Sequence, residues 1–515
     1  MARSVETDQE EAKTSSKEDS SGITEVTVIK QEADETVKEK DNPFPGIDEK
    51  KLLRKIDWHI IPILTLLYLL SFIDRANIGN AKIEGLDKSL NLTPAQYNWC
   101  LTVFFFTYSL FEIPCNIILK KMKPSIWLPG TMVAWGIVMI SMGFVQNYSG
   151  LIAARFFLGV AEAGLKPGVI YYLSRWYRRS ELQFRVGLFF SAAGAAGAFS
   201  GLLAYAISFM HGTRGLEGWR WIFILEGILT VLVALLAFWG VSDYPEKATF
   251  LTEEERAFTI ERLKYQNVIK ENPNGQNKGV EANDDFSWPA IRAAFCDWQV
   301  WMGVVLFWSC VAPLYGISLF LPTIINDLGF KKTTAQLMTV PVYIFAATVG
   351  IVVAWSADRI KKRTPLIAGS HVAILVGFIM CISTAQPAVV YTGIFLAAAG
   401  VYGAHPGNIS LISNNLAPNS KRAAGTGIHF AGGNLAGAMA ANFYRAKDGP
   451  RYILGHALEI GFVALGLVTV SIMAYTYDKI NKKRDRQMAN GEHIKYTEQE
   501  LSEQGDRAVT FRYML

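Results

Sequence analysis

Residues 151–173, LIAARFFLGVAEAGLKPGVIYYL, carry an arginine and a glutamate inside a mostly apolar run. Arg155 and Glu162 are these two residues, and the rest of the run has the composition of a membrane-spanning helix. An ionisable side chain at the centre of such a helix costs about 2.5–3.5 kcal/mol. Chains keep such residues mainly where they face a polar cavity or one another. The run therefore predicts a site that handles charge across a membrane.

Arg155 and Glu162 are seven residues apart, which puts them on one stripe of a helix. Seven residues return an α-helix nearly to its starting face, about 10 Å further along its axis. We therefore expect no direct pairing between them. Arginine stays protonated and offers a planar fork to a carboxylate, whereas a carboxyl group in a low-dielectric cavity favours its protonated form. These two residues therefore suit anion–proton symport, with Arg155 as a fixed positive charge that can receive an organic anion and Glu162 as a group that can titrate.

A second acid and a second cation, Asp74 and Arg75, lie in the segment FIDRANIGNAKIEGL. Neighbouring residues point about 100° apart on a helix, so these two can contact different partners. Asn77 adds an amide nearby and is a further candidate for contact with the substrate. A purely structural ion pair between helices, such as Asp74 with Arg155, is the alternative. Which arginine binds an anion, and which acid titrates, stays open at this point.

The elements that position these residues are predicted to be membrane helices. The chain is 51% hydrophobic and only 18% charged, which favours an integral membrane protein. Twelve apolar segments, each near the roughly 20 residues that cross a bilayer, predict an all-α fold. The predicted spans are 57–77, 95–119, 125–145, 150–173, 184–210, 220–242, 297–325, 334–356, 365–384, 388–412, 422–443 and 455–477.

Basic residues gather on alternate connections, as at 120–123, 175–179 and 359–363, so the positive-inside rule predicts that both termini are cytosolic. A long polar stretch separates six spans from six, and Thr252 with Glu255 predicts the capping box of a cytosolic helix within it. The predicted parts are a disordered cytosolic tail at 1–50, an N-terminal half at 51–243, a cytosolic linker at 244–296, a C-terminal half at 297–478 and a cytosolic tail at 479–515.

The two predicted halves repeat one another. Residues 187–204, GLFFSAAGAAGAFSGLLA, and residues 425–442, GTGIHFAGGNLAGAMAAN, are both rich in small residues, and both follow a basic connection. Small residues at this density let helices approach closely, and packing alone is their simplest role. The offset of six spans predicts a parallel repeat of two six-helix halves.

Several polar side chains in other spans are further candidates for contact with a substrate. Tyr315 lies beside the helix-kinking Pro313, and Tyr108 could face a cavity. For each candidate, core packing or a hydrogen bond within the protein is the alternative, as it is for His429 and for the intramembrane acids Glu112 and Glu226. The further candidates are Tyr108, Tyr315, His405, Asn408 and Asn434.

The motifs carry a resemblance to a known family. The connection GIVVAWSADRIKKRTP resembles the cytosolic signature of the major facilitator superfamily, which implies gating roles for Asp358 and Arg359. The matching connection in the first half keeps the lysines but has no acidic residue. The segments FIDRANIGNAKIEGL, RFFLGVAEAGLKPGVIYYLSRWY, WRWIFILEGILT and SNNLAPNSKRAAGTGI are similar to the anion:cation symporter branch, and most to fungal allantoate-permease-type transporters.

The resemblance covers about residues 50–485 and implies a fold and a function. It implies twelve transmembrane helices, Arg75 or Arg155 as carboxylate ligand, and Asp74 and Glu162 as proton sites. The implied function is proton-coupled symport of a small organic anion, a monocarboxylate such as nicotinate, by a monomer that works by alternating access in the plasma membrane. An exporter of an acidic metabolite and a membrane nutrient sensor are the alternatives.

The sequence contains no pattern typical of an enzyme. It has no phosphate-binding loop and no nucleophile–base pair in a polar segment, and its five cysteines show no metal-ligand spacing. We therefore expect no enzymatic activity, no cofactor, no metal and no nucleic-acid partner. The expected partners are a small organic anion, a proton and the lipid bilayer.

Overall fold

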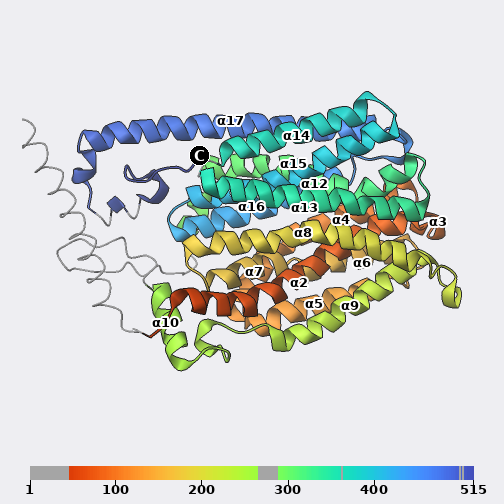
Figure 1. Ribbon diagram of the computed structural model, residues 1–515, viewed down its shortest axis with the longest axis horizontal. Helices are drawn as coiled ribbons and strands as arrows, with labels where there is room; N and C mark the ends of the chain where they lie inside the picture. Colours follow the sequence, from red (N-terminus) through yellow and green to blue (C-terminus); the bar gives the residue numbers. More distant parts are fainter. Residues whose placement is uncertain (1–45, 265–287, 361–362, 498–499, 502–503) are drawn as a thin grey trace, which may run out of the picture.

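The computed structural model is built from helices, and the part of the chain that it describes contains no strand (Figure 1). The described residues are 46–264, 288–360, 363–497, 500–501 and 504–515. Most of the predicted N-terminal tail and the centre of the predicted linker lie outside them. Every predicted span falls mostly on helix, and the span 150–173 is interrupted at residues 163–164.

The long helices form two sets, one before and one after the predicted linker. The first set is α2 (Glu49–Ile83), α3 (Leu86–Ser89), α4 (Pro94–Lys121), α5 (Pro124–Met142), α6 (Tyr148–Glu162), α7 (Leu165–Ser174), α8 (Arg179–Ser208) and α9 (Gly218–Gly240). After α10 (Glu253–Lys264) and α11 (Trp288–Phe295), the second set is α12 (Trp298–Asp327), α13 (Lys332–Ile360), α14 (Thr364–Ser383), α15 (Pro387–Asn415), α16 (Asn419–Ala440) and α17 (Ile453–Ala489).

Eight of the described helices are long and apolar enough to cross a membrane. These are α2, α5, α9, α12, α13, α14, α15 and α17. The chain is therefore a multi-pass membrane protein with an all-α fold. The count of twelve spans and the cytosolic position of both termini stay predictions.

The first and second sets of helices form the two sides of one bundle (Figure 1). The helices rich in small residues lie where the sets meet, because α8 packs against α13 and α16 packs against α4. A Cβ atom on Gly194 of α8 would lie 2.7 Å from the Cβ of Ala347 on α13. A Cβ on Gly437 of α16 would lie 2.5 Å from Cδ1 of Phe105 on α4. Glycine at these positions lets the two sides approach this closely.

The bundle has two ends, and we call the one that holds the start of α2 and the end of α17 the terminal end. At the opposite end, the far end, α2 contacts the second set of helices. A Cβ on Gly79 would lie 2.5 Å from the carbonyl oxygen of Leu319 on α12. Lys82 lies over the Phe320 ring at 5.6 Å, and Gln336 of α13 donates to Glu84 at 3.1 Å. The two sides are therefore in contact at the far end.

Helix α10 begins with the predicted capping box and packs at the terminal end. Glu255 N–H donates to Thr252 Oγ1 at 3.2 Å, and Thr252 N–H donates to Glu255 Oε2 at 2.9 Å, which confirms the sequence-based prediction. Lys55 of α2 pairs with the same glutamate at 2.6 Å. These contacts fix α10 against the start of α2.

Residues 504–515 of the C-terminal tail fold back onto the terminal end of the second set of helices. Asp506 is buried and accepts hydrogen bonds from Lys421 and Gln299, each at 2.8 Å. Asn415 at the end of α15 exchanges two hydrogen bonds with the backbone of Met514, at 2.8 and 3.0 Å. The tail therefore ties the ends of α12, α15 and α16 together.

The close contact at Gly79 generates a prediction about stability. Gly79→Ala should destabilise the protein by about 1–3 kcal/mol, because overpacking pushes α12 away from α2. Thermal unfolding of the purified protein in detergent measures the effect. Gly130→Ala is the matched control, since no atom lies within 4 Å of a Cβ there and alanine favours the helix. If both variants unfold at the wild-type temperature, the contact between α2 and α12 is looser than described.

Candidate anion and proton site

Helices α6 and α7 carry the predicted charged stripe, with a break directly after the acid. The buried residues of α6 recur every three or four positions and include Arg155 and Glu162, so both lie on one buried face. Helix α6 ends at Glu162 and α7 begins at Leu165. A Cβ on Gly159 would lie 2.6 Å from the carbonyl oxygen of Phe104, which explains how closely this face approaches α4.

Arg75 and Glu162 form a buried ion pair between α2 and α6. Arg75 Nε donates to Glu162 Oε1 at 2.6 Å, and the two residues are 5% and 2% exposed. The Ser71 hydroxyl, one helical turn before Arg75, donates to the same carboxylate oxygen. Loss of one partner from a buried pair leaves an uncompensated charge, which costs about 3–5 kcal/mol. The glutamate is thus bound to the arginine of α2 and not to Arg155.

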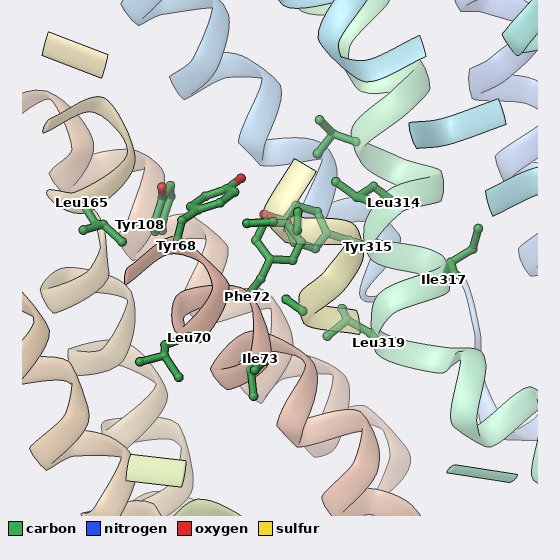
Figure 2. Packing of buried hydrophobic residues seen from close by; sticks show 14 of the residues in the cluster. Tyr68, Leu70, Phe72, Ile73, Tyr108, Leu165, Leu314, Tyr315, Ile317 and Leu319 are labelled. Carbon is green, nitrogen blue, oxygen red and sulfur yellow. The ribbon is translucent and has the colours of Figure 1, made fainter. Parts of the chain in front are cut away.

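The Arg75 guanidinium also contacts the second set of helices. Arg75 Nη1 donates to the Tyr315 hydroxyl of α12 at 2.8 Å. It also lies over the Tyr108 ring at 4.6 Å, and the Phe104 and Phe72 rings are each 5.6 Å away. Figure 2 shows Phe72, Tyr108 and Tyr315 gathered between these helices. Arg75 therefore connects the two sides of the bundle through Glu162 on one side and Tyr315 on the other.

Arg155 is a buried cation with open hydrogen-bonding capacity. It is 2% exposed, and its Nε and Nη2 atoms have no hydrogen-bond partner among the described residues. Its guanidinium lies 5.8 Å from the Phe104 ring, which also borders Arg75. A buried guanidinium is stable only where an anion or polar group compensates it. This side chain can receive a carboxylate.

Asp74 and Asn77 lie on another face of α2, away from the Arg75–Glu162 pair. Asp74 Oδ2 accepts from Trp135 Nε1 of α5 and from Thr230 Oγ1 of α9, each at 2.9 Å. Asn77 Nδ2 donates to Glu226 Oε2 of α9 at 2.5 Å. These contacts give the two residues partners within the first set of helices, and Asp74 has no ion pair with Arg155. Their predicted roles in substrate and proton binding stay predictions.

A buried lysine that the sequence-based selection missed lies toward the terminal end from the ion pair. Lys166 of α7 is 6% exposed and lies 4.6 Å from the Phe430 ring of α16. Glu112 of α4 is buried in the same region, and Asn434 of α16 donates to it at 3.2 Å. Lys166 stands four residues after Glu162, so the argument that selected the glutamate applied to it equally. This cluster is a second place where the two sides meet through charge.

The predicted residues of α15 lie near the same cluster. His405 stacks on the Phe307 ring of α12 with centroids 5.2 Å apart, and the His429 ring of α16 is 4.5 Å from that ring. Asn408 donates to Leu306 O at 3.3 Å and to Cys310 Sγ at 2.9 Å. Asn408 therefore joins α15 to α12, while His405 and His429 border Phe307.

The proposed gating pair lies apart from this region, near the end of α13. Arg359 is exposed, and its guanidinium lies 4.3 Å from the Trp355 ring one turn earlier on the same helix. The Asp358 side chain lies outside the described part of the chain, so the gating role of both residues stays a prediction. Within the described residues, no group of three or more His, Cys, Asp or Glu side chains is placed to hold a metal ion.

Three cations follow one another along the bundle axis. Helix α6 runs from the far end toward the middle, so Arg155 precedes the Arg75–Glu162 pair, and Lys166 on α7 follows it. On a continuous helix, the 11 residues from Arg155 to Lys166 would span about 16 Å. All three cations lie among aromatic rings, on Phe104, Tyr108 and Phe430. This arrangement can hold an anion at successive levels between the two sides.

Two named relatives match almost the whole chain. An uncharacterized transporter of Schizosaccharomyces pombe is 37% identical over 467 residues, which covers 91% of this chain and 90% of the relative. The high-affinity nicotinic acid transporter of Saccharomyces cerevisiae is 34% identical over 471 residues, which covers 90% of this chain and 85% of that protein.

The fold also matches a solved structure, and the sequence matches a family model. The crystal structure of a bacterial homologue of the human lysosomal transporter Spinster, in an inward-facing and occupied conformation, superposes with a TM-score of 0.61. That match has 15% identity and covers 81% of this chain and 97% of the other. The model of the Major Facilitator Superfamily matches residues 64–441. The chain therefore belongs to the major facilitator superfamily, a family of membrane transporters.

Proposed function

We propose that the protein is a proton-coupled symporter of a small organic anion, a monocarboxylate such as nicotinate, and that it works by alternating access in the plasma membrane. The observation that carries this proposal is the Arg75 guanidinium, which Glu162 and Tyr315 share at 2.6 and 2.8 Å. Arg75 is bound by Glu162, whose charge a proton can neutralise. It is also bound by Tyr315, which lies on the opposite side of the bundle.

Proton binding and anion binding are coupled through Arg75 in this mechanism. A proton that binds Glu162 removes the negative charge held at 2.6 Å from Arg75 Nε. The guanidinium is then a buried cation without a counterion, and a substrate carboxylate takes over that role. When Glu162 loses its proton to the other compartment, the ion pair forms again and displaces the substrate. By thermodynamic linkage, the proton and the anion then each raise the affinity for the other.

Arg155 and Lys166 extend this route in opposite directions. On the far-end side of Glu162, the Nε and Nη2 atoms of Arg155 have no hydrogen-bond partner among the described residues. Lys166 lies on the terminal-end side, against Phe430. An anion that enters from the far end meets Arg155 first, then Arg75, then Lys166. The direction of net movement follows from the gradients of proton and anion.

Two observations support a flat aromatic carboxylate as a first substrate to test. The Phe104 and Tyr108 rings border the arginines, and the Tyr315 hydroxyl accepts from Arg75. Aromatic rings of this kind pack on a planar substrate. The relative from Saccharomyces cerevisiae is named a nicotinic acid transporter. Uptake competition against a panel of monocarboxylates, with nicotinate as the labelled probe, tests this substrate class directly.

Glu162→Gln should abolish accumulation of nicotinate against its gradient but leave exchange of internal for external nicotinate intact. The amide keeps the shape of the carboxyl group but neither ionises nor forms an ion pair with Arg75. Uptake into cells at external pH 5 and pH 7 measures the effect, and uptake by the wild type should rise at the lower pH. The exposed Glu254→Gln on α10 is the control and should behave as the wild type. A Glu162→Gln variant that still concentrates nicotinate would show that another group carries the proton.

Arg155→Lys should weaken nicotinate binding by about 10- to 100-fold, because lysine keeps the charge but loses the planar fork that binds a carboxylate. Equilibrium binding to the purified protein measures the loss. Arg451→Lys, an exposed site at the far end, is the matched control and should leave affinity unchanged. If Arg155→Lys binds nicotinate as the wild type does, Arg75 alone is the carboxylate ligand.

A further inference from the structure

The second set of helices contains a buried acid that the mechanism above does not use. Glu459 of α17 is 0% exposed, and neither of its carboxyl oxygens has a hydrogen-bond partner among the described residues. Burying a polar group without a hydrogen bond costs about 2–7 kcal/mol, and burying an isolated charge costs far more. The carboxyl group is therefore stable here in its neutral, protonated form.

Glu459 rests against α12 at the residue beside Tyr315. A Cβ on Gly316 would lie 3.3 Å from Glu459 Cδ and closer still to Oε1, and it would lie 3.2 Å from the Tyr444 ring. Gly316 therefore leaves the space that Glu459 and Tyr444 fill. Its neighbour Tyr315 accepts the hydrogen bond from Arg75. Two adjacent residues of α12 thus contact the Arg75–Glu162 pair on one side and Glu459 on the other.

A series of ionisable side chains leads from Glu459 to the surface at the far end. The Tyr444 hydroxyl lies 3.2 Å from His456 Nδ1, and the Tyr444 and Tyr452 rings are 5.9 Å apart. The Tyr452 hydroxyl donates to the exposed Asp327 at 2.5 Å. Each of these groups can accept a proton or donate one.

We propose that Glu459 is a second proton-binding site of this protein, loaded from the far end through Asp327, Tyr452, Tyr444 and His456. Hydrogen bonds join Asp327 with Tyr452 and Tyr444 with His456. The proton crosses from the first pair to the second, and from the second to Glu459, as these side chains rotate, so the net change is one proton moved from water to the Glu459 carboxylate. The site requires only a proton as ligand. Its coupling to an anion rests on the proposed function, because that step needs the Arg75–Glu162 pair.

Within the described part of the chain, the elements around Glu459 bring it no charged counterion. His456 lies one turn before Glu459 on α17, and Tyr444 comes from the segment after α16. On α14, Cys381 lies near Tyr444, and His371 lies beside Gly466, two turns further along α17. Helix α12 presents Gly316. Loss of the proton would leave a buried negative charge at Glu459. That charge favours movement of α12 away from α17, and this movement would change the contact between Tyr315 and Arg75. In this way a proton at Glu459 holds α12 in the arrangement described.

Infrared spectroscopy of the purified protein tests for the resident proton without any substrate. A protonated carboxyl group has a carbonyl stretching band that a carboxylate lacks. Glu459→Gln should remove one such band at neutral pH, whereas Glu217→Gln should not, because Glu217 is partly exposed and lies 3.6 Å from Arg220. An unchanged band in Glu459→Gln would overturn the proposal.

Proton stoichiometry in proteoliposomes tests the coupling of this site. The number of protons that move with each nicotinate, measured by comparing proton uptake with uptake of labelled nicotinate, should be one lower in Glu459→Gln than in the wild type. An equal number in both would mean that Glu459 is not coupled, whereas no proton movement in the wild type would mean that the proposed function itself fails. If Glu459→Gln does not fold, Asp327→Asn carries the test. It should slow proton entry several-fold at unchanged stoichiometry, and an unchanged rate would contradict the route.

Discussion

A buried guanidinium must always have an anion or dipoles beside it, and the centre of this protein is organised by that requirement. Arg75 lies between the two sides of the bundle, where Glu162 compensates its charge at 2.6 Å and Tyr315 accepts its second hydrogen bond at 2.8 Å. Burying the pair is costly unless its geometry is close and its remaining lone pairs are satisfied, and Ser71 satisfies one of them. Any change in the charge of Glu162 therefore changes what Arg75 must bind.

This constraint gives α2 and α12 their particular roles. Helix α2 presents Arg75 to the centre and Asp74 to α5 and α9, so adjacent residues serve different contacts. Helix α12 likewise presents Tyr315 to Arg75 and Gly316 to Glu459. Small residues on α8 and α16 let the two sides approach closely enough for these contacts. A helix that touches a titratable group on each side is well placed to respond to either.

Much of the fold and part of the site could be predicted from local patterns in the sequence. Apolar runs predicted the helices, the seven-residue spacing placed Arg155 and Glu162 on one buried stripe, and Thr252 with Glu255 marked the start of α10. The family match confirms a transporter and not an enzyme. The partner of Glu162 was not predictable, because the rotation of α2 about its axis depends on packing against several helices at once. The short-range periodicity of the sequence does not determine that rotation.

The two residues missed have different causes. Lys166 lies in the same run as Arg155 and Glu162, so the argument that selected the glutamate applied to it equally, whereas Glu459 is a single acid in a long apolar run and only its packing shows that it faces α12. Proton uptake during nicotinate binding tests the central claim about Arg75 most directly. Isothermal titration of the purified protein in buffers of different ionisation enthalpy should show close to one proton taken up per anion above neutral pH, and none in Glu162→Gln. Binding that takes up no proton in the wild type would contradict exchange of Glu162 for the substrate carboxylate at Arg75.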